Sequence, residues 1–193
     1  MNLHNIPPII LASKSPRRQE LLKLMDLDFT IVLKEVDESY PAGLQPEEIA
    51  VYIARKKAEA FDEDINNEIV LTADTIVSIS GHILGKPETS EHAIEMLKIL
   101  SGKTHQVITG VCLLYKHHYH DFFDVSDVYF RELDEAEIVN YVTRYQPMDK
   151  AGSYGIQEWV GLTGIERING SYTNVVGLPT EKLYRELKRV VTI

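Results

Sequence analysis

Two arginines, Arg17 and Arg18, follow two serines near the start of the chain. Ser15 is a favoured helix N-cap residue and Pro16 suits the first helical position, so both arginines fall in the first turn of a predicted helix. This is the positive end of the helix dipole, where acidic residues are favoured. An anion such as phosphate, held by the helix N-terminus, the arginines and the hydroxyls of Ser13 and Ser15, would resolve the conflict. The alternative is that both guanidinium groups extend into water.

Three more charged residues are candidates, and two of them occupy unusual positions. Asp74 interrupts an apolar strand predicted over residues 69–79, where a buried carboxylate is costly unless it is paired. It could be a general base or a metal ligand, or it could mark a bulge or an exposed strand end. Lys57 falls on the apolar face of a helix predicted from position 46 to about position 61, where it could contact a phosphate or extend along the surface to water. Lys86 lies in a loop, where a solvated lysine is the favoured interpretation.

Residues 149–157 form a glycine-rich segment that could approach a ligand closely. The amide of Gln157 offers both a donor and an acceptor to the edge of a base. Segments of this composition are more often simple turns. Three histidines, at positions 117, 118 and 120, resemble a metal cluster, but they fall in a predicted hairpin tip, and we interpret them as an exposed turn.

The charge balance limits the partners that the chain could bind. It has 29 acidic and 20 basic residues and a formal net charge of −9, which argues against broad binding to a nucleic acid polymer or an anionic membrane. Any basic site must therefore be local and suited to a small anion. One cysteine excludes an intrachain disulfide. No apolar run is long enough to span a bilayer, so we expect a cytoplasmic protein.

Predicted strands and helices alternate along the chain. Together they indicate an α/β fold with a mixed, twisted sheet and flanking helices. We expect one domain over residues 1–193, with room for two lobes around a central cleft. The expected strands cover residues 9–12, 29–33, 69–79 and 82–84, two long segments between 104 and 132, and 165–168. The expected helices begin at 16, cover 46–61, 90–100 and 134–144, and include the region from 180 onward.

Seven segments stand out along the chain: 12–18, 54–58, 73–75, 85–87, 101–105, 149–157 and 170–179. In this order they resemble the motifs of the Maf proteins, a family of nucleoside triphosphate pyrophosphatases. The resemblance implies a fold related to the inosine triphosphate pyrophosphatases and hydrolysis of a nucleoside triphosphate to the monophosphate and pyrophosphate. It also implies a divalent metal cation, with Mg²⁺ the usual choice, and allows a homodimer.

The resemblance assigns roles to residues already singled out. Asp74 becomes the proton acceptor, and Asp74 and Glu38 become the metal ligands. Arg17, Thr75 and Gln157 match the branch that acts on dTTP and UTP, rather than the branch that acts on 7-methyl-GTP. The residues that would bind the triphosphate are Ser13, Ser15, Arg17, Arg18, Lys57 and Lys86.

The chain departs from the family pattern at two positions. Gln146 stands before a proline where an acidic residue is usual, and Glu158 follows Gln157 where glycine is common. The second departure adds a negative charge beside the expected base pocket.

The resulting hypothesis is a pyrophosphatase for dTTP, UTP and related modified pyrimidine nucleotides. One alternative is a 7-methyl-GTP-type enzyme. Another is a nucleotide-binding regulator of cell division that does not need turnover.

Overall fold

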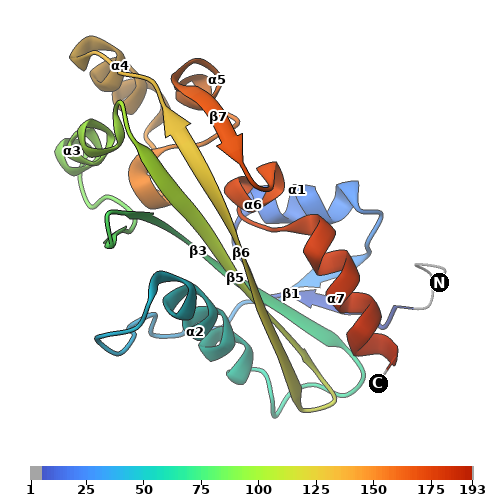
Figure 1. Ribbon diagram of the computed structural model, residues 1–193. Coiled ribbons are helices and arrows are strands. Elements are labelled where there is room, and N and C mark those ends of the chain that lie inside the picture. The colour runs from blue at the N-terminus through green and yellow to red at the C-terminus, as the bar shows by residue number, and fades with distance from the viewer. Residues whose placement is uncertain (1–5, 193) are drawn as a thin grey trace. The chain divides into compact units, whose positions relative to one another are not determined.

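A mixed sheet runs through the computed structural model, which describes residues 6–192 (Figure 1). The strands follow the order β2-β1-β3-β5-β6-β7, and β4 pairs with β3. β1 is parallel to both β2 and β3, whereas the β3–β4 and β6–β7 pairs are antiparallel. The predicted α/β class and mixed sheet are therefore confirmed.

The described chain divides into two units. The first runs up to Asp74 and also includes Thr109–Asp124 and the residues from Gly177 onward; the second comprises Thr75–Ile108 and Val125–Val176. Three strands pass through both units: β3 (Ile69–Ile79), β5 (Thr104–Tyr115) and β6 (His118–Phe130).

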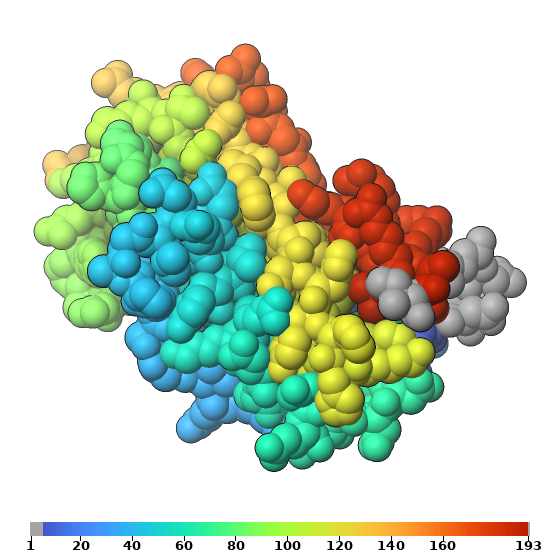
Figure 2. Space-filling view, turned by 60° about the horizontal axis from the view of Figure 1, so that its bottom comes forward, coloured from blue at the N-terminus to red at the C-terminus, as the bar shows by residue number. Residues whose placement is uncertain are grey.

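The first unit contains the strands and helices that carry the opening motif. Its complete elements are β1 (Ile9–Leu11), α1 (Pro16–Leu24), β2 (Phe29–Ile31), α2 (Pro46–Glu59) and α7 (Thr180–Thr192). Helix α2 packs so closely on β5 that a Cβ at Gly110 would lie 2.3 Å from the carbonyl carbon of Ala50. In Figure 2 the surface of α2 adjoins the first residues of β6, where Arg55 and Asp121 form an ion pair at 2.6 Å.

The second unit has its own apolar core around helices α3 and α4, which lie side by side (Figure 1). Tyr141 and Leu97 are completely buried in this core. The complete elements of the unit are β4 (His82–Leu84), α3 (Ser90–Leu100), α4 (Glu135–Tyr145), the 3₁₀ turn η2 (Ala151–Ser153), α5 (Trp159–Gly164), β7 (Ile165–Asn169) and α6 (Tyr172–Val176).

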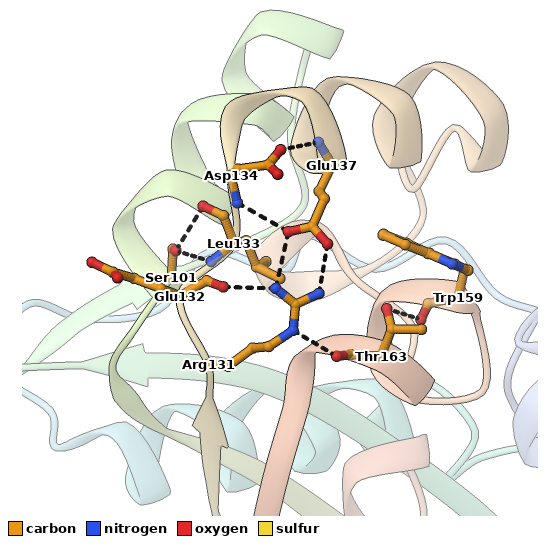
Figure 3. A network of polar contacts seen from close by, with 8 residues as sticks. All are labelled: Ser101, Arg131, Glu132, Leu133, Asp134, Glu137, Trp159 and Thr163. Atoms are coloured by element: carbon orange, nitrogen blue, oxygen red, sulfur yellow. Dashed lines mark hydrogen bonds and ion pairs between the residues drawn. The ribbon is translucent and has the colours of Figure 1, made fainter.

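A polar network joins the end of β6 to α4 and α5 (Figure 3). The guanidinium of Arg131 donates to both carboxylate oxygens of Glu137, at 2.6 and 2.9 Å, and to the carbonyl of Thr163 at 2.8 Å. Glu137 also accepts from the backbone N–H of Asp134, while the Asp134 side chain caps α4. This network fixes the start of α4.

Most predicted elements are confirmed, one local prediction is wrong, and two helices were not expected. Helix α3 is capped by Thr89, whose hydroxyl accepts from the N–H of His92 at 3.2 Å. The β5–β6 turn consists only of Lys116 and His117, both at positive φ, so two of the three histidines belong to β6. The short helices α5 and α6 were not expected.

No helix within residues 6–192 is long and apolar enough to cross a membrane.

Candidate active site

The N-terminus of α1 has the predicted cap. Ser15 adopts an extended backbone conformation, and its hydroxyl accepts a hydrogen bond from the N–H of Arg18 at 3.4 Å. Ser13 is buried, and its hydroxyl oxygen accepts from the N–H of Ser15 and from Nη1 of Arg18, each at 3.2 Å. The two serines therefore fix the loop and the first turn that carry the arginines.

Arg18 joins three segments that are distant in sequence. Besides Ser13, its Nη1 donates to the carbonyl of Ala73 at 3.0 Å, and its Nε donates to the carbonyl of Gly177 at 2.8 Å. Burial lowers the pKa of the Arg18 guanidinium, while the negative charge of Asp74 raises it. Arginine remains protonated in proteins, so Arg18 places a positive charge near Asp74 and holds the backbone immediately before it.

Lys57 lies between two carboxylates. Its Nζ is 2.8 Å from Oδ1 of Asp74 and 2.9 Å from Oε1 of Glu38. The side chains of Lys57 and Asp74 are 17% and 15% exposed, whereas that of Glu38 is 50% exposed. Lys57 projects from α2 and Asp74 from β3. The buried charge in the strand is thus paired, and the lysine on the apolar helix face is not extended into bulk water.

The same two carboxylates suit a magnesium ion. No group of three or more histidine, cysteine, aspartate or glutamate side chains among residues 6–192 is arranged to hold a metal. Mg²⁺, however, is commonly held by one or two carboxylates, with the other positions filled by water and substrate phosphates. Glu38 and Asp74 already direct oxygens at one cation, the Lys57 ammonium, and this donor set fits an ion that binds together with a triphosphate.

The other predicted site residues are half-buried or exposed. Arg17 is half-buried on α1 in the first unit. Thr75 is half-buried, and Lys86 and Gln157 are exposed; these three belong to the second unit. The residues that the first unit brings together are Ser13, Ser15, Arg18, Glu38, Lys57 and Asp74.

Both departures from the family pattern have local partners. Gln146 ends α4 in the left-handed conformation, with φ 47°, and its side-chain amide donates to the carbonyl of Val142 at 3.2 Å. Glu158 forms an ion pair with Lys150 at 3.0 Å. The added negative charge is therefore compensated inside the second unit.

Sequence reasoning missed the groups that hold Arg18. The carbonyls of Ala73 and Gly177 are backbone atoms, and no side-chain pattern could indicate them. It also missed Lys150 and Tyr141 as contacts of Glu158.

The chain is similar to curated proteins over almost its whole length. A dTTP/UTP pyrophosphatase of Bacteroides fragilis is 57% identical over 184 residues, covering 94% of this chain and 95% of the relative. A protein of the same name from Flavobacterium psychrophilum is 53% identical over 177 residues, covering 91% of each chain.

Solved structures show the fold at lower identity. A HAM1 protein from Coxiella burnetii covers 94% of this chain and 98% of its own, with a TM-score of 0.50 and 17% sequence identity. The model of the Maf family, described as Maf-like protein, matches residues 8–190. With this match and relatives above 50% identity, the chain belongs to the Maf-like protein family.

Proposed function

We propose that this protein is a nucleoside triphosphate pyrophosphatase that hydrolyses dTTP and UTP to the monophosphate and pyrophosphate. The names of its relatives support the reaction and the substrate class. The observation that carries the proposal is the Glu38–Lys57–Asp74 arrangement, because it puts a largely buried carboxylate next to a cation in a chain whose relatives are named as pyrophosphatases.

Asp74 acts as the proton acceptor in this proposal. It takes a proton from a water molecule as the water oxygen attacks the α phosphorus. The bond from that phosphorus to the oxygen bridging the α and β phosphates breaks, and pyrophosphate leaves. Lys57 and Arg18 keep Asp74 in place, since one pairs with its carboxylate and the other holds the carbonyl of Ala73.

The charge of the triphosphate needs several cations. Arg17, Lys57 and Lys86 are proposed to bind its phosphates together with Ser13, Ser15 and Arg18. A Mg²⁺ ion held by Glu38 and Asp74 would supply further neutralisation of the phosphate charge. The Arg18 guanidinium donates three hydrogen bonds to the protein itself, which supports a positioning role for Arg18 beside any phosphate contact.

Base preference is assigned to Arg17, Thr75 and Gln157, following the family resemblance. We also propose a homodimer on the same ground, and a cytoplasmic location as expected from the sequence.

A triphosphate panel with pyrophosphate detection tests the function. With Mg²⁺, we expect turnover of dTTP and UTP at least about tenfold faster than that of purine triphosphates, and loss of turnover on chelation. Asp74→Asn should lower kcat by about 10²-fold or more, as expected on removal of a general base. Asp28→Asn, which neutralises an exposed carboxylate of the same unit, should leave kcat unchanged.

Other outcomes favour the alternatives. Fastest turnover of 7-methyl-GTP would indicate the sister activity. Nucleotide binding without hydrolysis of any triphosphate would favour a regulator. Wild-type turnover by Asp74→Asn would refute the assigned proton acceptor.

A further inference from the structure

Gln157 is carried by a tight turn in the second unit. The N–H of Glu158 donates to the carbonyl of Gly155 at 3.0 Å, which closes a four-residue turn. Within it, Ile156 is buried and Gln157 is exposed. The turn therefore holds its apolar residue in the core and presents the amide of Gln157 to the outside.

One hydroxyl group joins both ends of this turn. Tyr141, completely buried on α4, accepts from the N–H of Gly155 at 3.1 Å and donates to Oε2 of Glu158. Burial and the hydrogen bond to Glu158 raise the pKa of Tyr141, so its hydroxyl stays protonated and able to donate. On the other side of the carboxylate, Nζ of Lys150 is 3.0 Å from Oε1 of Glu158. We call Tyr141, Lys150 and Glu158 the turn brace.

The brace packs directly on the glycine of the turn. A Cβ at Gly155 would lie 2.8 Å from Cδ of Glu158 and 3.0 Å from Cε of Lys150. The ion pair therefore occupies the space that any larger residue would need. The segment is also anchored just before the turn, because Tyr154 is buried and its hydroxyl is 2.7 Å from Nε2 of His105.

We propose that the turn brace is a positioning device that fixes Gln157 and so sets the preference for dTTP and UTP over other triphosphates. The inference rests on the proposed function, in which Gln157 contacts the base. A side chain that projects from a fixed backbone loses less conformational entropy on binding its correct base than one that projects from a mobile backbone. A loosened turn would remove that advantage only for the correct base, and discrimination would fall more than turnover.

The test compares small changes in the brace. Tyr141→Phe removes only the hydroxyl, Glu158→Gln keeps an acceptor of the same shape, and Glu158→Ala removes the acceptor. Tyr145→Phe is the matched control, because Tyr145 stacks on Tyr141 from the same helix at a ring distance of 5.0 Å. For each variant we would measure kcat and KM for dTTP, UTP, dCTP and GTP, together with Tm.

We expect Tyr141→Phe and Glu158→Ala to lower kcat/KM for dTTP and UTP about tenfold, chiefly through KM, and to change that for dCTP and GTP less than twofold. Glu158→Gln should retain more of the discrimination than Glu158→Ala, and Tyr145→Phe should match wild type. Affinity for α,β-methylene dTTP, measured by calorimetry, should fall in parallel with the change in KM.

If kcat/KM fell equally for all four substrates and in proportion to the fall in Tm, the inference would be refuted, and the brace would have only a structural role. Unchanged discrimination in both Tyr141→Phe and Glu158→Ala would also refute it. A wild-type enzyme that does not prefer dTTP or UTP would instead overturn the proposed function, so the two failures are distinguishable.

Discussion

Replacing Lys57 by methionine should destabilise the protein mainly because it leaves the Asp74 carboxylate uncompensated. At 2.8 Å and an effective dielectric constant of about 20, the Lys57–Asp74 attraction is about 6 kcal/mol before desolvation is counted. Removing one partner of a buried pair typically costs about 3–5 kcal/mol. Arg18 still places a positive charge near Asp74 in this variant. We therefore expect the free energy of unfolding of Lys57→Met to be only about 2 kcal/mol below that of the wild type.

The effect of a second substitution, Asp74→Asn, on the free energy of unfolding distinguishes an uncompensated charge from lost packing. Adding Asp74→Asn to Lys57→Met removes the unpaired charge, so the double variant should be about 1 kcal/mol more stable than Lys57→Met alone. Glu38→Gln is the control: the Glu38 side chain is half-exposed, and its pair with Lys57 should contribute less than about 1 kcal/mol.

Urea unfolding at pH 7, followed by circular dichroism, measures all four free energies. The reasoning fails if the double variant is no more stable than Lys57→Met, or if Lys57→Met changes the free energy of unfolding by less than about 0.5 kcal/mol.

Two further predictions concern stability. Hydrogen bonds from Arg131 and from the backbone of Asp134 lower the pKa of Glu137 from its usual 4.5 to about 2, so this carboxylate stabilises the fold above pH 4.5 and the contribution disappears as the pH falls toward 2. Urea unfolding should therefore show Glu137→Gln less stable than wild type at pH 7, with the difference shrinking below pH 4.5; a constant difference would contradict the assignment. Gly110→Ala should lower the free energy of unfolding by about 3 kcal/mol, because its Cβ would overlap the α2 backbone, whereas Gly85→Ala, with no atom within 4 Å of the added Cβ, should change it by less than about 0.5 kcal/mol. Thermal unfolding of both variants checks this, and equal Tm values would count against the close approach of α2 and β5.

The long elements were predictable because their own residues specify them. β3 and α2 show clear apolar patterns, and Asp134 supplies a cap for α4. Helices α5 and α6 have six and five residues, and helices this short are marginal without tertiary contacts. Their formation depends on packing that the local sequence does not encode.

The sequence indicated which residues form the candidate site, but not which contacts they make with one another. Lys57 and Asp74 stood out because charged side chains interrupt apolar patterns. Their mutual ion pair depends on how α2 packs on β3, which spacing along the chain does not reveal. Arg18 was expected to contact phosphate, and its bonds to two backbone carbonyls could not be anticipated from residue types.

The passage of three strands through both units limits how this protein could be recombined. The chain moves between the units four times, after Asp74, Ile108, Asp124 and Val176. Neither unit is one continuous segment of the chain, so exchanging a single segment could not replace one unit and keep the other. A substitution at Gln157 or in its turn is therefore made in the same chain that must also form the Lys57–Asp74 pair.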